Sequence, residues 1–277
     1  MSDLLIETKE IGNHRIKIYY DTYVDCPCTD WDMAACYLFE YNDRYRSRLS
    51  NACNWRELFA DDNHSLNEAL IKLANDYVPT KNIIQFFKNE TKEYRLKYNN
   101  SSKMWELQGK HWRTGEWDVV NEFDSQYLHN GGWNHEMLEV LEDEELVELI
   151  NDFGKDIFIK EWSTTGYSQG DYVKGVAFCT KERYINRVSK DTSDWKQKTD
   201  SFIDGEVECI GMWMWGDVKG YELEKKVRFK KVYEDEDMDD EEDFEWEEVD
   251  SCWGYYMETE ELINEVISIH NLKEEVA

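Results

Sequence analysis

The residues with the greatest capacity for chemistry in this sequence are carboxylates, and they gather in two clusters. We name them the helix cluster and the hairpin cluster, after the elements predicted to carry them. The helix cluster is Glu139, Glu142, Asp143, Glu144, Glu145 and Glu148. The hairpin cluster is Asp235, Glu236, Asp237, Asp239, Asp240, Glu241, Glu242 and Asp243. Carboxylates arranged along ordered elements can bind the lysines and arginines with which a partner protein would otherwise contact nucleic-acid phosphates. Both clusters are therefore candidate sites for a basic partner.

Catalytic chemistry has little support in the residue pattern. A cysteine nucleophile such as Cys252 needs a base beside it, and no histidine accompanies it in sequence. The chain has neither a phosphate-cradling glycine loop nor an H-E-x-x-H zinc motif. We expect a non-enzymatic protein with no cofactor. The 61 acidic residues hide any catalytic pair, so a metal-dependent enzyme built on clustered Asp and Glu stays open as an alternative.

Four aromatic residues form a second candidate site. Trp213, Trp215, Trp253 and Tyr255 lie in two short segments and are able to stack on a base, each contact contributing about 1–3 kcal/mol. An anionic nucleotide would also need nearby cations, for which the candidates are Lys174, Lys219 and Arg228. The sequence leaves open whether these aromatics line a nucleotide pocket or belong to the core.

The seven cysteines are odd in number and irregularly spaced. Because no secretory signal precedes them, we expect free thiols in a reducing cytoplasm. Cys26 and Cys28 form a single C-x-C pair, whereas structural zinc sites use two such knuckles. A metal site and buried thiols both stay open there. Cys179 and Cys209 lie in apolar runs and are expected in the core.

Charge limits the partners of the chain. Its 277 residues contain 32 basic and 61 acidic side chains, a net charge of −29. Such a charge repels nucleic-acid phosphate and anionic lipid, so direct binding to either is disfavoured. The run 234–250 contributes 13 carboxylates, and the remainder still has a net charge of −16. The acidity is therefore a property of the whole body, for which solubility is the simplest explanation and a cationic partner the alternative.

Hydrophobic spacing predicts the elements that position these residues. Residues 15–20 alternate as a strand, and Ser65 with Glu68 forms a capping box that opens a helix. Residues 94–107 predict a hairpin, and residues 135–153 predict one helix that ends at Gly154.

The second half of the chain is predicted to be richer in strands. Further expected elements are strands at 156–162, 173–180 and 250–256, a helix at 191–202, a hairpin of 206–215 with 218–233, and a closing helix with Thr259 as its cap. The basic residues of 218–233 precede the acidic run, which suggests charge pairing across a ribbon. The fold class is α+β with antiparallel hairpins and flanking helices. We place a domain boundary near residue 154, between regions 1–154 and 155–277.

The C-terminal half resembles a family of uncharacterised accessory proteins carried by tailed phages and prophages of Gram-positive bacteria. The matching segments are 170–183, Gly205-Glu-Val-Glu, Gly216-Asp-Val-Lys-Gly-Tyr-Glu-Leu-Glu and Glu248-Val-Asp-Ser-Cys-Trp-Gly-Tyr-Tyr. The chain departs from the family at 161–166, where a histidine of the family is missing, and in its longer acidic hairpin. The resemblance implies a phage or mobile-element origin and an accessory role.

Together these observations favour a phage-encoded acidic inhibitor of a host anti-phage defence protein. It would act in the host cytoplasm through protein–protein binding, with nucleic-acid mimicry as one form of that binding. The partner would be a defence protein with a basic face, such as a nuclease, and self-association would add avidity. The alternatives are a sponge that sequesters a nucleotide signal and the metal-dependent enzyme.

Overall fold

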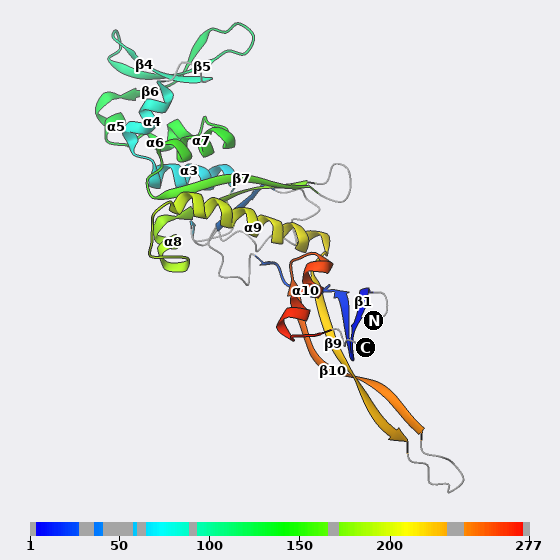
Figure 1. Ribbon diagram of the computed structural model, residues 1–277. Helices are drawn as coiled ribbons and strands as arrows, with labels where there is room; N and C mark the ends of the chain where they lie inside the picture. Colours follow the sequence, from blue (N-terminus) through cyan, green and yellow to red (C-terminus); the bar gives the residue numbers. More distant parts are fainter. Residues whose placement is uncertain are drawn as a thin grey trace. The chain divides into compact units, whose positions relative to one another are not determined.

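The computed structural model describes residues 4–27, 36–40, 58–59, 65–88, 93–165, 172–231 and 241–273. These residues form a mixed α+β structure with antiparallel sheets, as the sequence predicts (Figure 1). The chain divides into two compact units, of which unit 1 contains residues 1–30 and 208–277, and unit 2 contains residues 31–207. Unit 2 is therefore inserted between the two segments of unit 1. Within the described part of the chain, no helix is both long and apolar enough to cross a membrane.

Unit 1 is built on a four-stranded antiparallel sheet in the order β1-β2-β9-β10. Its strands are β1 (Leu5–Ile11), β2 (His14–Tyr20), β9 (Lys219–Lys231) and β10 (Glu241–Tyr255). The two outer segments of the sequence meet where β2 pairs with β9, with His14 opposite Lys225 and Tyr20 opposite Lys219. We call β9 and β10 together the ribbon, because they pair from Lys219 and Tyr255 to Lys231 and Glu241.

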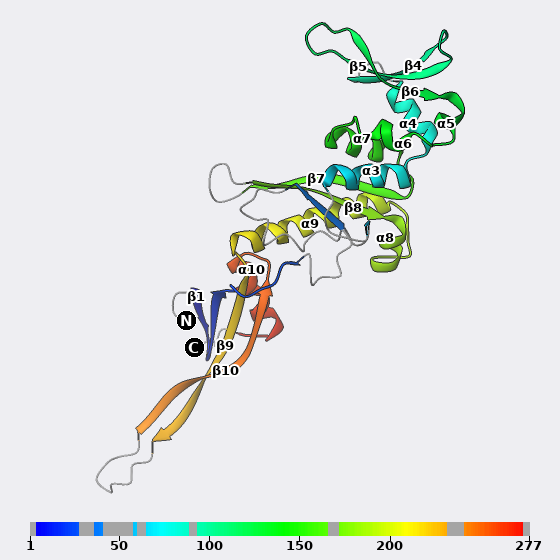
Figure 2. The ribbon, with the colours of Figure 1, turned by 180° about the vertical axis from the view of Figure 1, so that it is seen from behind.

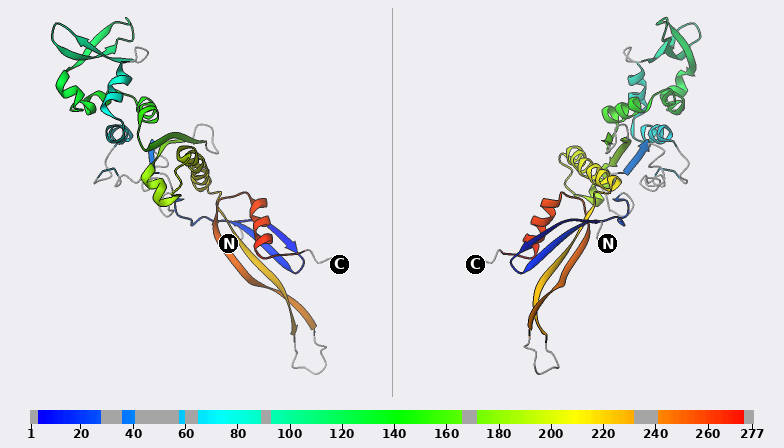
Figure 3. Two further views of the ribbon diagram at one scale, coloured as in Figure 1. Left: turned by 60° about the vertical axis from the view of Figure 1, so that its left-hand side comes forward. Right: turned by 90° about the vertical axis from the view of Figure 1, so that its right-hand side faces the viewer.

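The core of unit 1 lies between this sheet and one helix. α10 (Thr259–Ile269) buries its apolar side on the sheet, as the two views in Figure 3 show. The buried residues are Ile11, Ile16, Ile18, Tyr221, Leu223, Leu262, Ile263 and Val266. The alternating burial of β2 confirms the predicted strand at 15–20. The closing helix is also present, but its N-cap is Glu258, and Thr259 is its first helical residue.

The prediction of a strand at 206–215 is wrong. These residues belong to α9 (Trp195–Trp215), a helix of 21 residues. Its buried positions Trp195, Thr199, Ile203, Ile210 and Met214 repeat at intervals of four or seven, which is a helical period. The alternation of polar and apolar residues from Glu206 to Cys209, followed by an apolar run to Trp215, imitates a strand over that short window. Its supposed partner strand is real, but β9 pairs with β10 and β2 instead.

Unit 2 contains a three-stranded antiparallel sheet with helices packed beside it (Figure 2). The strand order is β3-β8-β7, from β3 (Cys36–Glu40), β8 (Tyr172–Thr180) and β7 (Ile157–Thr165). The helices described in this unit are α3 (Leu66–Tyr77), α4 (Thr80–Phe87), α5 (Ser125–His129), α6 (Asn134–Leu138), α7 (Asp143–Phe153), α8 (Lys181–Arg187) and the first part of α9. Ser65 caps α3 with the predicted capping box.

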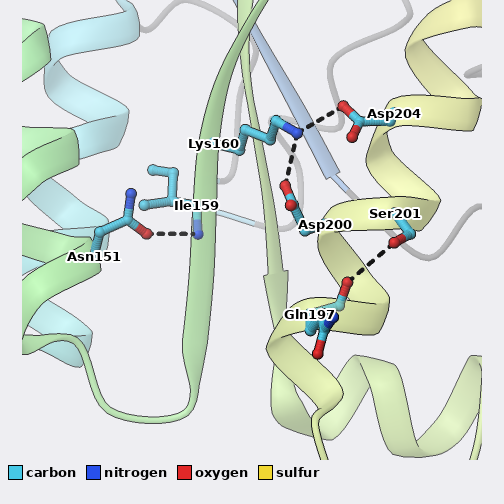
Figure 4. Close-up of polar contacts among 7 residues, drawn as sticks. All are labelled: Asn151, Ile159, Lys160, Gln197, Asp200, Ser201 and Asp204. Carbon is cyan, nitrogen blue, oxygen red and sulfur yellow. Dashed lines mark hydrogen bonds and ion pairs between the residues drawn. The ribbon is translucent and has the colours of Figure 1, made fainter.

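Strand β7 is held between α7 and α9 by polar contacts (Figure 4). Asn151 Oδ1 of α7 accepts a hydrogen bond from the backbone N–H of Ile159 at 3.4 Å. The Lys160 ammonium contacts Asp200 Oδ1 at 2.7 Å and Asp204 Oδ1 at 2.6 Å, both on α9. Burial alone would lower the pKa of Lys160, but its bonds to Asp200 and Asp204 raise it. These contacts hold α7 and α9 against the same strand.

A second antiparallel sheet of unit 2 has the order β4-β5-β6. Its strands are β4 (Tyr94–Asn99), β5 (Met104–Lys110) and β6 (Trp117–Asp124). The hairpin predicted at 94–107 is confirmed, with Asn99 opposite Met104 and Lys103 in a left-handed turn conformation.

Two boundaries differ from the sequence predictions. The helix expected over 135–153 is broken into α6 and α7, because Glu142 begins a new helix as its N-cap; Gly154 is its C-cap as predicted. The domain boundary placed near residue 154 lies inside unit 2, since α7 before it packs on β7 after it. The actual boundaries lie near residue 30 and within α9.

Candidate functional site

The helix cluster lies on a packed platform. α7 buries Leu146, Val147, Leu149 and Ile150, and it packs against α3 and β7. This apolar side fixes the helix, so the carboxylates stand on its remaining surface. Glu139, Glu142, Glu144 and Glu148 are exposed, and Asp143 and Glu145 are half-buried. The structure thus brings the six predicted residues together on α7 and the turn before it.

Part of the helix cluster also builds the helix. The side chain of Glu142 accepts from the backbone of Glu145, and Glu145 Oε2 accepts from the backbone N–H of Glu142 at 3.3 Å. Asp143 Oδ1 accepts a bond from the Asn67 amide at 2.9 Å. Acidic residues in the first helical turn also interact favourably with the helix dipole. Three members of the cluster therefore support α7, which leaves Glu139, Glu144 and Glu148 as the positions best suited to test binding.

The helix cluster has no lysine or arginine within its own segment of the sequence. The segment from Glu139 to Glu148 contains six carboxylates and no lysine or arginine. Glu139 contacts the exposed His135 ring at 3.1 Å, one turn earlier. Asp143 and Glu144 line a small pocket of about 240 Å³, together with Glu161 and Lys174. The segment is a concentrated patch of negative potential on an ordered surface.

The hairpin cluster has a different setting. Asp235, Glu236, Asp237, Asp239 and Asp240 lie outside the described residues. Glu241, Glu242 and Asp243 begin β10, where Glu241 is opposite Lys231 and Glu242 is opposite Lys230. Further along the ribbon, Glu247 is opposite Lys225. The register therefore places acidic residues of β10 across from basic residues of β9, as expected from the order of the two charge runs.

Charges within the sheet of unit 1 nearly balance. Strands β2, β9 and β10 together contain eight basic and nine acidic side chains. The Glu224 carboxylate forms ion pairs with Arg15 at 2.6 Å and with Lys17 at 2.7 Å. Burial is the largest single influence and would raise the pKa of Glu224, but the bonds from Lys17 and Arg15 outweigh it and lower the pKa. The Arg15 guanidinium also lies 4.3 Å from the centre of the Trp246 ring.

The four predicted aromatic residues do not form one pocket. Trp213 is buried in α9 and donates its indole N–H to the carbonyl of Val24 at 3.0 Å. Trp215 lies on the same helix, and Tyr255 packs against the core of unit 1 and the ring of Tyr221. Trp253 lines a pocket together with tyrosines of β2 and the loop after it. The sequence signal that could have found this pocket is the Tyr19-Tyr20-Asp21-Thr22-Tyr23 string.

Sequence reasoning also missed a polar cluster around Asp250. Asp250 Oδ2 accepts from the Tyr221 hydroxyl at 2.6 Å and lies 3.0 Å from His270 Nε2. The Tyr221 bond, followed by the charge of His270, lowers the pKa of Asp250. Burial and the Asp250 carboxylate raise the pKa of Tyr221, so this hydroxyl stays protonated. The cluster fastens β10 to β9 and to the residue after α10, and its tyrosine is a poor nucleophile.

The cysteines fit a thiol interpretation where they are described. Cys26 and Cys179 are buried, and burial raises the pKa of Cys179 to about 11. Cys209 is only half-buried, and Cys28 lies outside the described residues. Among the residues that the structure describes, no three His, Cys, Asp or Glu side chains are arranged to hold a metal ion.

Comparison of the chain with protein-family models, curated proteins and solved structures yields no match. The site is therefore interpreted from its own geometry.

Proposed function

We propose that this protein is a phage-encoded acidic inhibitor that binds the basic face of a host anti-phage defence protein. The observation that carries the proposal is the helix cluster, which concentrates six carboxylates on the packed helix α7 and the turn before it, in a segment without lysine or arginine. The phage origin and the accessory role rest on the family resemblance of the C-terminal half, and the defence target is our hypothesis for that role.

A fixed acidic surface suits this role for two physical reasons. Complementary charge steers a cationic partner toward the surface and speeds association at low salt. Because α7 is already ordered, little conformational entropy is lost when its exposed carboxylates meet lysine or arginine. A nuclease face that normally contacts phosphates offers such cations, so the helix cluster would compete with nucleic acid for it.

The ribbon is a weaker candidate for the same contact. Three of its acidic positions, Glu241, Glu242 and Glu247, lie opposite lysines of β9 in the register, and a partner would have to compete with these lysines. The helix cluster is accordingly the principal contact in this proposal. The nucleotide sponge has less support, because the pocket beside Trp253 is lined by Asp21 and Glu222, which disfavour a phosphate.

Two variants with equal charge change test the proposal. The helix variant combines Glu139→Gln, Glu144→Gln and Glu148→Gln, and the ribbon variant combines Glu245→Gln, Glu247→Gln and Glu248→Gln. All six side chains are exposed. The tagged wild-type chain and both variants would be used to capture proteins from a host lysate, at low and at high salt. Circular dichroism would confirm that each variant is folded.

We expect the wild type and the ribbon variant to capture a basic defence protein in a salt-sensitive complex. Because the helix variant loses three exposed charge contacts, its affinity for this partner should fall by about tenfold to a hundredfold. Phage plating on a host that carries the defence system should rank the proteins in the same order, with stronger protection of the phage by the wild type and the ribbon variant than by the helix variant. Equal capture and equal protection by the two variants would contradict the proposal.

A further inference from the structure

A pocket in unit 1 is lined by a different chemistry from the acidic clusters. It encloses about 800 Å³ between the end of β2, the loop that follows and β10. Four of its lining residues are aromatic, and two are carboxylic. The lining residues are Leu4, Tyr19, Tyr20, Asp21, Thr22, Tyr23, Val24, Glu222 and Trp253. A volume of this size is within the range of small-molecule sites.

One face of the Trp253 ring covers the backbone of Gly220, and the other face points away from it. A Cβ built on Gly220 would lie 2.1 to 2.8 Å from three atoms of the six-membered ring of Trp253. Only glycine permits this approach. The ring is 47% exposed, and its centre lies 5.9 Å from that of Tyr19. Trp253 and Tyr19 therefore form a continuous aromatic wall.

The loop that closes the pocket is fixed by three hydrogen bonds. The backbone N–H of Asp21 donates to the Val218 carbonyl at 2.7 Å. The Asp21 side chain accepts from the backbone N–H of Tyr23 at 3.1 Å. The Trp213 indole holds the Val24 carbonyl, as described above. The pocket is thus formed before any ligand arrives, which reduces the entropy lost on binding.

The charge of the pocket is negative. Among the described residues, no lysine, arginine or histidine lines it, whereas Asp21 and Glu222 do. The Tyr19 hydroxyl donates to Glu222 Oε2 at 2.9 Å and so orients the carboxylate within the aromatic wall. The nearest cations of β2, Arg15 and Lys17, are bound to Glu224. An anionic ligand would be repelled here, and a cation would be attracted.

From this combination we propose that the pocket binds a small organic cation with an alkylated ammonium head and an apolar body. The aromatic wall of Trp253 and Tyr19 would hold the head by cation–π attraction, and Glu222 and Asp21 would supply the opposite charge. A volume larger than the head alone leaves room for the body beside Leu4 and Val24. The inference goes beyond the proposed function and is independent of it, because the helix cluster belongs to unit 2.

A pair of ligands with the same shape and different charge tests the inference. Choline and its neutral carbon isostere, 3,3-dimethyl-1-butanol, would be titrated into the full chain by calorimetry, with benzyltrimethylammonium as a larger cation and ATP as an anion. We expect both cations to bind, the neutral isostere to bind at least tenfold more weakly, and ATP to give no heat. Equal binding of choline and its isostere, preference for ATP, or no binding of either cation at millimolar concentration would overturn the proposal.

Variants assign the binding to this pocket. Trp253→Leu should weaken the binding of choline about fivefold to thirtyfold, because it removes a cation–π contribution of about 1–2 kcal/mol. Glu222→Gln should weaken the binding of both cations and leave the binding of the neutral isostere unchanged. Trp112→Leu is the matched control, because Trp112 is 80% exposed in unit 2. Tyr23→Ala is a second pocket variant that spares the fold, since this side chain is 92% exposed. Unchanged binding in both Trp253→Leu and Tyr23→Ala would overturn the assignment.

Discussion

The helix cluster and strand β10 of the ribbon are both rich in carboxylates, but they differ in the residues around them. The carboxylates of the helix cluster stand on a helix that apolar packing holds in place, with no lysine or arginine in their own segment. In β10, Glu241, Glu242 and Glu247 lie opposite lysines of β9 in the register of the ribbon. In our proposal, a run of carboxylates marks a partner surface where the fold leaves its charge unbalanced.

The largest expected effect tests the packing beneath the helix cluster. Leu149→Ala removes a fully buried side chain from α7 and should lower the free energy of unfolding by about 2–5 kcal/mol. Urea unfolding followed by circular dichroism would measure it. Val249→Ala in the ribbon is the control, because Val249 is 52% exposed and should change stability by less than about 0.5 kcal/mol. Similar losses in both variants would remove the distinction between the two regions.

An intermediate effect tests the ion pairs of the sheet in unit 1. Glu224→Gln removes the carboxylate that Arg15 and Lys17 share and should destabilise the protein by about 1–3 kcal/mol at neutral pH. The pKa of Glu224 is lower in the folded chain than its ordinary value of 4.5, so the unfolded chain takes up this proton first as the pH falls. The stabilisation is therefore present above pH 4.5 and is lost below it.

Unfolding measurements between neutral pH and about pH 3 would test this dependence. The difference between the wild type and Glu224→Gln should shrink through the acidic part of the range. A difference that stays constant with pH would show that Glu224 acts through packing and not through its charge.

The smallest effect compares one charge reversal in each region. Glu247→Lys places a lysine opposite Lys225 and should destabilise the ribbon by about 0.2–1 kcal/mol. Glu144→Lys introduces a cation among the carboxylates of the helix cluster, where its attraction to them offsets its unfavourable position near the helix N-terminus. Its effect should stay within about 0.5 kcal/mol. Thermal unfolding at low and high salt would distinguish the two variants. A larger loss of stability for Glu144→Lys than for Glu247→Lys would reverse the comparison.

Local signals in the sequence predicted much of the fold. The capping box at Ser65, the alternation in β2 and the turn between β4 and β5 are determined by neighbouring residues. The prediction failed at 206–215, where a short alternation followed by an apolar run obscured the longer helical period of α9. It also missed that Glu142 begins a new helix, because Ser, Thr, Asp and Asn are the usual N-caps.

The candidate sites were predictable only in part. The six residues of the helix cluster are close in sequence, so α7 and the turn before it bring them together. The aromatic pocket combines Tyr19 and Trp253, which meet only because β9 pairs with both β2 and β10. No local pattern specifies that pairing. Trp213 and Trp215 lie in α9 and not in the strand expected at 206–215, so they do not join this pocket.

The insertion of unit 2 into unit 1 has a consequence for synthesis on the ribosome. β1 and β2 are translated first, but their partner β9 begins only at Lys219. The inserted residues 31–207 are complete before then and are free to fold while the N-terminal hairpin waits with one edge unpaired. Sequence changes that speed or stall translation through α9 would therefore alter how long that edge stays open to aggregation.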